Sequence, residues 1–379
     1  MKVGVAVIGD VLDINCWSNI PYYFYNTGAK IGLFHNPFRL NPSLLSLQQK
    51  IWNIKQLLKG KNIGGYQFSR SFQASAETQI PKEFFSEKVI SFSQVFPRGR
   101  TVIEAGGEIY YYIDTSLYDL FRLTSYKLRI SKSARNEAIE LEMENYQSAT
   151  KIVTMGTWAR KSLLDYYNLP ENKIETILPG ANLVLPAEYS PPKWRAGAGI
   201  NRDFVLGFVG KDWNRKGLPI LIKIKNSLKE QGLRIKVKVI GDAPEYIRKD
   251  PDVDFLGFID KLKSPEKFAM ELSTCDLGCL FSSGEALGIS TLEFIKAGIP
   301  VAGFYQQGLK DTLFEGISLR FDPEEDFDVI TKRLFEYILN PLDQISFFSD
   351  IPNYRNSVTW ENCIDKWAHI LQNEPVLIS

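Results

Sequence analysis

The feature that most constrains the fold is an alternation of short apolar runs with longer amphipathic runs. In the first half of the chain the apolar runs occupy 2–8, 89–92, 108–113 and 151–155. In the second half the same alternation restarts at Phe204 and continues to about residue 302. Strands that alternate with helices are joined by crossovers, which favours parallel sheets covered by helices on both faces. We therefore predict an α/β fold of the doubly wound type.

The alternation is interrupted once, at 179–202. This stretch holds four prolines and three glycines and shows no strong periodicity, as expected of a linker. A chain of 379 residues is also long for one hydrophobic core and suits two domains. We expect two Rossmann-like domains that face each other across a cleft, the first at 1–185 and the second at 200–355. Ligands of such domains bind at the carboxyl ends of the strands.

The balance of charge argues against a polyanionic partner. The chain has 45 Lys and Arg against 44 Asp and Glu, a net charge of +1, whereas binding to nucleic acid needs a clustered positive surplus. No apolar run reaches the roughly 18 to 20 residues of a membrane span, and residues 1–8 do not resemble a signal peptide. We expect a soluble cytoplasmic protein that does not bind nucleic acid.

A turn between two carboxylates lies at 284–293, with the sequence Gly-Glu-Ala-Leu-Gly-Ile-Ser-Thr-Leu-Glu. It follows a predicted strand and precedes a helical run, so a helix should begin near Ser290. Amide groups at a helix N-terminus favour an anion such as a pyrophosphate. Glu285 and Glu293 would flank this anion and could accept hydrogen bonds from sugar hydroxyls. Each glutamate could instead be an ordinary solvated surface residue.

A second glycine-bounded loop follows the predicted strand 204–209. Its sequence at 210–217 is Gly-Lys-Asp-Trp-Asn-Arg-Lys-Gly. Glycines such as Gly210 let the backbone turn tightly, and Lys211 and Lys216 can place two positive charges on a diphosphate. Neutralisation by lysine would make a metal unnecessary at the leaving group. The alternative is a basic surface turn exposed to solvent.

Together the two motifs resemble the C-terminal domain of retaining GT-B glycosyltransferases of family 4. The pattern is Gly-Lys-x(4)-Lys-Gly at 210–217, then Glu-x(7)-Glu at 285–293 and Ala-Gly-Ile-Pro-Val at 297–301. The family usually has arginine where this chain has Lys211. Lysine keeps the positive charge but lacks the guanidinium group that can bind a phosphate through two hydrogen bonds. It commonly has Glu-Pro-Phe-Gly where this chain has Glu-Ala-Leu-Gly at 285–288.

The resemblance implies a role for each residue of these motifs. Glu293 would hold the ribose hydroxyls of a nucleotide-sugar, and Glu285 would contact the transferred sugar. Lys211, Lys216 and the amides near the helix start would stabilise the departing nucleoside diphosphate. Those amides belong to Gly288, Ile289 and Ser290, with Gly210 close to the phosphates. The resemblance also implies that a C-terminal helix, at 356–379, crosses back to the first domain.

Looser matches extend the resemblance to the rest of the chain. Phe258 and Ile259 lie in a segment similar to the family's Phe-x-Gly strand and loop beside the nucleotide base. Trp17, Ser18 and Asn19 resemble the acceptor-side loop, although Asn19 stands where the family commonly has glycine. Asp114 follows a predicted strand where many relatives place a His or Asp near the reacting sugar.

No metal is expected. The four cysteines and two histidines match no zinc spacing. An Asp-x-Asp sequence at 250–254 resembles the metal signature of the other large glycosyltransferase fold, GT-A, but an oxygen-liganded cation needs more converging carboxylates. The resemblance therefore implies a metal-independent enzyme whose co-substrate is a nucleoside diphosphate sugar and which has no further cofactor.

The resemblance thus implies a retaining hexosyltransferase, of class EC 2.4, that moves a sugar to a hydroxyl of a carbohydrate or other small acceptor. Two alternatives stay open: a nucleotide-sugar epimerase of the same fold, and a binding protein that does not catalyse transfer. The donor base, the sugar and the acceptor are not determined by these motifs. The basic segment 122–135 could form an amphipathic face that touches anionic lipid, but an exposed helix balanced by the glutamates after it is favoured.

Overall fold

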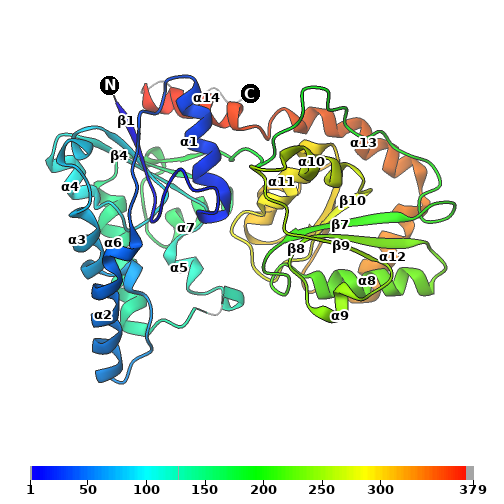
Figure 1. Cartoon of the computed structure of the whole chain (residues 1–379), viewed down its shortest axis with the longest axis horizontal. Helices are drawn as coiled ribbons and strands as arrows, with labels where there is room; N and C mark the ends of the chain where they lie inside the picture. The colour runs from blue at the N-terminus through cyan, green and yellow to red at the C-terminus, as the bar shows by residue number, and fades with distance from the viewer. Residues whose placement is uncertain (1, 127, 373–379) are drawn as a thin grey trace. The chain divides into compact units, whose positions relative to one another are not determined.

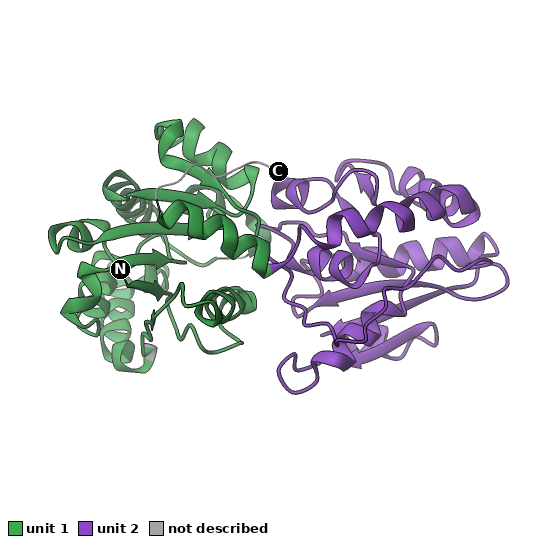
Figure 2. Ribbon diagram, turned by 90° about the horizontal axis from the view of Figure 1, so that it is seen from above, with its two compact units in different colours: residues 1–179, 360–379 green, residues 180–359 purple. Residues whose placement is uncertain are grey.

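The structure is a computed structural model that describes residues 2–126 and 128–372. The chain folds into two compact units, shown in different colours in Figure 2. Unit 1 comprises Met1–Pro179 and Trp360–Ser379, and unit 2 comprises Gly180–Thr359. The chain therefore leaves unit 1 at Pro179 and returns to it at Trp360.

Unit 1 contains a parallel sheet of six strands in the order β2-β1-β3-β4-β5-β6. The strands are β1 (Val3–Ala6), β2 (Asn36–Pro37), β3 (Lys88–Ser91), β4 (Glu108–Ile113), β5 (Lys151–Thr154) and β6 (Ile174–Thr176). Most residues of β1, β3 and β4 are buried, as expected of parallel strands covered on both faces. Because β1 lies between β2 and β3, the strand order reverses at β1, and the loop after β1 lies at the position where such folds bind ligands.

The helices of unit 1 are α1 (Ile20–Lys30), α2 (Ser46–Leu58), α3 (Arg70–Glu77), α4 (Gly99–Glu104), α5 (Leu117–Leu120), α6 (Lys132–Ser148), α7 (Thr157–Asp165) and α14 (Trp360–Leu371). Three of them begin with a serine cap. The hydroxyls of Ser69, Ser116 and Ser131 accept hydrogen bonds from amides in the first turns of α3, α5 and α6. Such caps satisfy amide groups that have no partner inside the helix.

The C-terminal helix α14 packs on unit 1 beside α1 (Figure 1). Trp367 is completely buried, and its ring lies 5.2 Å from the ring of Tyr112 and 5.6 Å from that of Phe24. The buried Lys88 of β3 donates a hydrogen bond of 2.5 Å to the carbonyl of Leu371. Aromatic packing and this hydrogen bond therefore hold the end of the described chain on the first sheet.

The basic segment 122–135 does not form a single helix, contrary to both sequence-based interpretations, the face that touches lipid and the favoured exposed helix. Its described residues contain a short 3-10 turn at Thr124–Tyr126, and α6 begins at Lys132. Arg135 donates hydrogen bonds to the carbonyls of Phe121 and Leu128. These contacts fold the segment back on itself, so its basic residues do not share one helical face.

Unit 2 contains a second parallel sheet of six strands, in the order β12-β11-β10-β7-β8-β9. The strands are β7 (Phe204–Gly210), β8 (Ile235–Gly241), β9 (Val253–Gly257), β10 (Leu277–Leu280), β11 (Val301–Phe304) and β12 (Ser318–Phe321). The first strand of the unit, β7, lies between β8 and β10, with Leu206 opposite Leu277. The order again reverses there, so the loops after β7 and β10 leave the sheet side by side at its carboxyl edge.

The helices of unit 2 are α8 (Leu218–Glu230), α9 (Glu245–Arg248), α10 (Pro265–Ser273), α11 (Ile289–Ala297), α12 (Phe327–Leu339) and α13 (Pro341–Arg355). The apolar faces of α8 and α12 cover the sheet through Leu221, Ile224 and Leu334. β12, α12 and α13 follow the last strand that the sequence pattern predicts. None of the helices in the described part of the chain is both long enough and apolar enough to span a membrane.

Candidate active site

The loop after β7 is shaped by a glycine at its end. Gly217 has a φ of +80°, and a Cβ atom there would lie 2.0 Å from the carbonyl oxygen of Phe281. A side chain at this position would therefore clash with the backbone of the β10 loop. The two loops meet directly, because the amide of Ser283 donates to the carbonyl of Arg215 over 2.8 Å.

Arg215 joins the two loops and was not among the residues proposed from the sequence. Its Nη1 atom donates to the carbonyl of Gly284 over 2.6 Å and lies 3.0 Å from the Oε2 atom of Glu285. Its Nε atom donates to Asp212 over 3.0 Å. Only 12% of the side chain is exposed, so this guanidinium fixes the position of Glu285 from within the site.

The turn from β10 into α11 depends on Gly288. This residue caps α11 with a φ of +85°, and a Cβ atom there would lie 2.4 Å from the side chain of Leu309. Gly288 has no side chain, so no side-chain cap accepts hydrogen bonds from the first amides of α11. These amides at the N-terminus of the helix include those of Ile289 and Ser290. A helix N-terminus carries a partial positive charge and favours an anion.

Both glutamates of the motif are buried and paired with cations. The Nζ atom of Lys216 lies 3.5 Å from Oε2 of Glu285, so this carboxylate contacts Lys216 and Arg215 together. The side chain of Glu293 is 1% exposed, and its Oε1 atom lies 2.5 Å from the Nζ atom of Lys261. The structure therefore does not support the alternative that these glutamates are solvated surface residues.

The ion pair of Glu285 with Lys216 and that of Glu293 with Lys261 are coupled electrostatically. Burial raises the pKa of Glu293 above its usual value, and the positive charges of Lys261 and Lys216 oppose this rise. Lys216 thus acts on both glutamates, since it also contacts Glu285. Lys261 follows Phe258 and Ile259 in the chain, but no motif indicates its pairing with a residue 32 positions away.

Two of the expected nucleotide contacts lie at the end of β9. Ile259 is buried, whereas the side chain of Phe258 is 61% exposed. The Nζ atom of Lys211 lies 4.8 Å from the centre of the Phe258 ring, within the range of a cation–π contact. The loops after β7 and β9 therefore meet at this aromatic side chain, which presents a ring face beside a positive charge.

The carboxylates of the Asp-x-Asp sequence are engaged by lysines. Asp250 pairs with Lys225 and Asp252 pairs with Lys229. Asp254 lies 3.2 Å from Lys238. Across residues 2–126 and 128–372, no group of three or more His, Cys, Asp or Glu is arranged to hold a metal ion.

The expected acceptor-side residues lie on unit 1. Trp17, Ser18 and Asn19 form a tight turn after β1, with φ values of 40°, 58° and 68°. Three consecutive residues with side chains in the left-handed region are strained, and such strain is concentrated at functional sites. The ring of Trp17 packs edge-on against Phe92, at the end of β3. Asp114 is half-buried and follows the last residue of β4.

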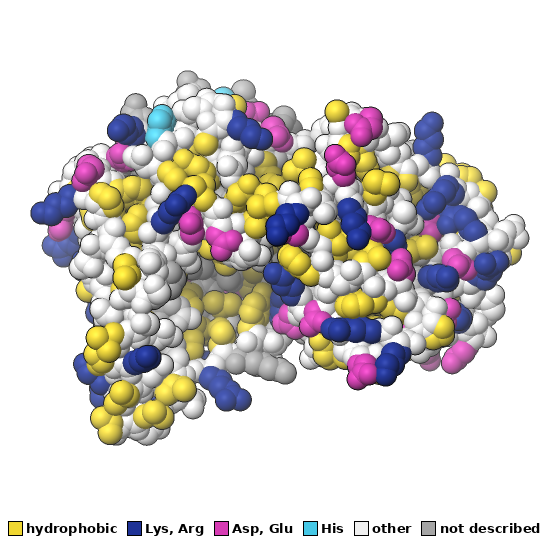
Figure 3. All heavy atoms as spheres, in the orientation of Figure 1, with side chains coloured by type: hydrophobic (Ala, Val, Ile, Leu, Met, Phe, Trp, Pro, Cys, Tyr) yellow, Lys and Arg dark blue, Asp and Glu magenta, His cyan; other side chains and the backbone are white. Residues whose placement is uncertain are grey.

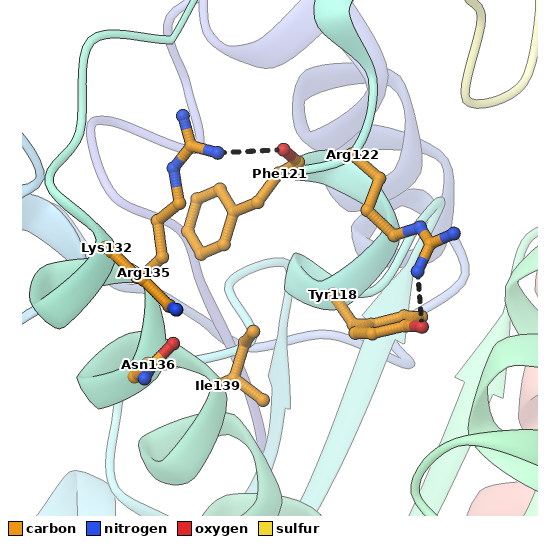
Figure 4. A pocket seen from close by; sticks show the side chains of 7 residues that line it. All are labelled: Tyr118, Phe121, Arg122, Lys132, Arg135, Asn136 and Ile139. Carbon is orange, nitrogen blue, oxygen red and sulfur yellow. Dashed lines mark hydrogen bonds between the residues drawn. The ribbon is translucent and has the colours of Figure 1, made fainter.

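A hollow of about 390 Å³ opens on unit 1 near the carboxyl end of β4 (Figure 4). It is lined by Tyr118, Phe121, Arg122, Lys132, Arg135, Asn136 and Ile139. Arg122 donates to the hydroxyl of Tyr118 over 2.6 Å, and Lys132 reaches the hollow from the start of α6. The lining has three cationic side chains and no carboxylate. The basic segment is visible in the sequence, but this hollow is not, because its walls come from two segments that the fold brings together.

The predicted residues therefore separate into three groups, two in unit 2 and one in unit 1. In unit 2 the structure brings together Lys216, Glu285 and Glu293 at the carboxyl edge of the sheet, with Gly210, Gly288, Ile289 and Ser290 in the adjoining turns. Lys211, Phe258 and Ile259 form a neighbouring group. In unit 1, Trp17, Ser18, Asn19 and Asp114 lie in loops that follow strands.

Two Rossmann-like units with parallel six-stranded sheets, and a last helix that returns to the first unit, define the GT-B fold class. Solved structures support this class. Sucrose-phosphate synthase from Thermosynechococcus elongatus matches with a TM-score of 0.65 and 12% identity, over 98% of both chains. HepE from Anabaena, solved with UDP and glucose, matches with a TM-score of 0.55 and 15% identity, over 75% of this chain and 77% of HepE.

The sequence comparisons point to one family in unit 2. Residues 203–335 match the model of the family described as glycosyl transferases group 1. A D-inositol 3-phosphate glycosyltransferase from Corynebacterium kroppenstedtii is 24% identical over 263 residues. This match covers 60% of the chain and 57% of the relative, so the chain spans a little over half of that protein's length. The family match includes every candidate residue of unit 2.

Proposed function

We propose that this protein is a glycosyltransferase that moves a sugar from a nucleoside diphosphate sugar to a hydroxyl of a carbohydrate or other small acceptor. The observation that carries the proposal is the arrangement around Glu285 and Glu293. Two buried carboxylates, one of them held in place by Arg215, meet the cation Lys216 and the N-terminus of α11 at the carboxyl edge of one sheet. This arrangement provides acceptors for sugar hydroxyls and positive charge for a diphosphate.

The leaving group is the part of the donor that requires positive charge. As the bond from the sugar to the diphosphate breaks, negative charge develops on the phosphate oxygens. Lys211 and Lys216 would neutralise this charge together with the first amides of α11. These residues supply fixed charge without a metal, so we propose that transfer is metal-independent. Gly210 would let the loop backbone approach the phosphates.

The two carboxylates would orient the donor. Glu293 would accept hydrogen bonds from the ribose hydroxyls, with Lys261 holding its carboxylate in the ionised state. Glu285 would contact the transferred sugar, and Phe258 and Ile259 would lie beside the base. We propose retention of the anomeric configuration, which the resemblance to family 4 supports. UDP is the first nucleotide to test, because HepE was solved with UDP.

The acceptor would bind unit 1. The strained turn at Trp17, Ser18 and Asn19 and the half-buried Asp114 are the candidates for positioning its hydroxyl. The hollow lined by Tyr118, Arg122 and Lys132 could receive the remainder of the acceptor, since an aromatic ring and cations, with no carboxylate in the lining, suit a sugar that carries an anionic group. Exclusion of water during transfer would protect the donor from hydrolysis.

A thermal-shift screen tests the proposal. UDP, GDP, ADP and their common sugar conjugates are added to the wild type, to Glu293→Ala and to Glu266→Ala, an exposed control in the same unit. A ligand that binds only the folded state adds roughly 2 to 4 kcal/mol at about 100 to 1,000 times its dissociation constant. We expect one nucleotide to raise the melting temperature of the wild type and the control but not of Glu293→Ala.

The other outcomes of the screen distinguish the proposed transferase from its alternatives. If no nucleotide or nucleotide-sugar shifts the wild type, the proposed donor site is wrong. If one binds, product analysis decides the reaction. Transfer to an added acceptor supports the proposal, whereas isomerisation of the sugar without acceptor would identify an epimerase. Binding without any turnover across a panel of acceptors would identify a nucleotide-sugar binding protein.

A further inference from the structure

Helix α2 presents an apolar stripe to solvent. Leu47, Ile51, Ile54 and Leu58 are spaced by four, three and four residues, so they share one face of the helix. Their exposed fractions are 64%, 44%, 55% and 82%. We call these four residues the α2 stripe. Three further apolar side chains close to it in sequence are also exposed: Leu44, Leu57 and Ile63.

The opposite face of α2 packs on the protein through one aromatic residue and several polar ones. Trp52 is half-buried against the core of unit 1, and its ring lies 6.2 Å from that of Tyr66. Gln56 is buried, and Gln48 and Asn53 are half-buried. The side-chain oxygens of all three are shielded from solvent and accept no hydrogen bond from the described residues. A helix on the surface of a soluble domain normally has its apolar face inward and its polar face outward. In α2 Trp52 packs inward, but most of the apolar side chains face outward instead, which indicates that the outer face is covered by something other than water.

The surroundings of the stripe are positively charged. Lys50 and Lys55 flank it on opposite sides of the helix, and Lys59 follows its C-terminal end. From residue 14 to residue 76 the chain contains no Asp or Glu. The same stretch contains seven basic residues: Lys30, Arg39, Lys50, Lys55, Lys59, Lys61 and Arg70. What covers the stripe should therefore combine an apolar interior with a negatively charged surface.

The positive charge continues from α2 onto the start of α6. Lys61 donates a hydrogen bond of 2.7 Å to the hydroxyl of Ser133, which brings the loop after α2 against this second segment. Arg129 and Lys132 are exposed nearby in the chain. Figure 3 shows apolar and basic side chains together on the part of the surface that α2 forms in Figure 1.

We propose that the α2 stripe is a membrane-docking surface that inserts into an anionic lipid leaflet. The helix would lie in the plane of the interface, with the stripe among the upper acyl chains and the flanking lysines at the lipid phosphates. Pairing with a second copy of the chain is less favourable, because a two-fold contact along the stripe would bring the lysines of the two copies close together. This inference does not depend on the proposed transfer reaction.

Vesicle flotation of the full chain tests the proposal. We expect binding to vesicles that contain phosphatidylglycerol, little binding to pure phosphatidylcholine, and release at high salt. The variant Ile51→Gln/Ile54→Gln/Leu58→Gln should lower the partition coefficient by at least about tenfold, since it removes the inserted side chains. In Lys50→Gln/Lys55→Gln/Lys59→Gln, each replaced lysine should lower it roughly fivefold.

The matched controls lie on unit 2. Leu342→Gln replaces an apolar side chain that is 75% exposed, and Lys332→Gln replaces an exposed lysine. Both should bind vesicles like the wild type. Equal binding of wild type and stripe variant, or no preference for anionic vesicles, would overturn the proposal. So would a wild-type dimer in light scattering that the stripe substitutions convert to monomer, since the stripe would then be a protein interface. Unchanged melting temperatures would confirm that the variants are folded.

Discussion

The ammonium of Lys261 lies 2.5 Å from the carboxylate of Glu293, and the two side chains are 15% and 1% exposed. Lys261 also lies 4.6 Å from the centre of the Phe268 ring, so its charge is held between a carboxylate and an aromatic face. A buried carboxylate stays ionised only when nearby positive charge or hydrogen-bond donors compensate for its lost hydration. Glu293 therefore depends on Lys261, a residue outside both glycosyltransferase motifs.

Removal of this lysine should destabilise the protein. In Lys261→Met the carboxylate of Glu293 stays buried without its partner, which typically costs about 3 to 5 kcal/mol. We expect a corresponding fall in the free energy of unfolding, measured by urea denaturation at pH 8. Lys263→Met, which replaces an exposed lysine two residues away, should unfold like the wild type.

A double variant tests the cause of this fall. Adding Glu293→Gln to Lys261→Met removes the unpaired charge, so it should restore much of the lost stability. If the single variant unfolds at the same urea concentration as the wild type, the pair does not hold Glu293 in the way that its burial suggests.

Arg215 is expected to act as a positioning residue in transfer. It fixes both the carbonyl of Gly284 and the carboxylate of Glu285 through one guanidinium, a geometry that lysine cannot reproduce. A displacement of Glu285 by about 1 Å could cost on the order of 10²-fold in rate. We therefore expect Arg215→Lys to lower kcat by this order while the dissociation constant of the nucleotide changes little.

The control for this effect is Arg234→Lys. Arg234 also pairs with a carboxylate, that of Asp203, but it is largely exposed. Its substitution should leave kcat and the melting temperature unchanged. A weaker nucleotide affinity in Arg215→Lys with normal kcat would contradict the positioning role, because it would place Arg215 in donor binding instead.

The alternation of apolar and amphipathic runs was enough to predict two doubly wound sheets, because parallel strands must be buried and joined by helices. It missed β12, a four-residue strand with the sequence Ser-Leu-Arg-Phe at the edge of the second sheet. Only one of these residues is buried, so the strand has no continuous apolar run. The prediction of a helix at the basic segment 122–135 was wrong for a related reason. The pattern of charges does not show the tertiary hydrogen bonds of Arg135, which fold this segment back on itself.

The motifs located the candidate site but not the residues that support it. The spacing of Glu285 and Glu293 relates to one turn and one helix, so it can be recognised locally. Arg215 and Lys261 contact these glutamates from positions 70 and 32 residues away. Such contacts arise from the strand order, which places the β7 and β10 loops side by side. That order cannot be derived from the local pattern of a single sequence.

Trp367 should carry much of the attachment of α14 to unit 1. Its indole is fully buried among the rings of Phe24, Tyr110 and Tyr112. Truncation of a buried aromatic side chain to alanine costs about 3 to 5 kcal/mol. We expect Trp367→Ala to lose this much stability in urea denaturation, whereas Asp365→Ala, at an exposed position of the same helix, should lose little. A wild-type unfolding curve for Trp367→Ala would show that α14 is not held by this packing.

Glu142 should make the stability of the protein depend on pH. Its carboxylate is completely buried in unit 1, where it accepts hydrogen bonds from the amide of Leu117 and from the hydroxyls of Tyr146 and Tyr167. Burial nevertheless raises the pKa of Glu142 to about 7. The folded state therefore binds this proton more tightly than the unfolded state, in which a glutamate has a pKa of about 4.3.

The sign of the effect follows from this difference in pKa. The stabilisation that the protonated Glu142 contributes is complete below about pH 4.3 and is lost as the pH rises to about 7. Relative to Glu142→Gln, which cannot ionise, the wild type should lose on the order of 3 kcal/mol across this window. Melting temperatures at pH 5, 6, 7 and 8 measure the difference, with the exposed Glu140→Gln as the control. Other titrating groups, Glu293 among them, are common to both proteins and cancel in the comparison. Parallel curves for the wild type and Glu142→Gln would show that Glu142 ionises in the folded state near its ordinary pKa, which would mean that the three hydrogen-bond donors outweigh its burial.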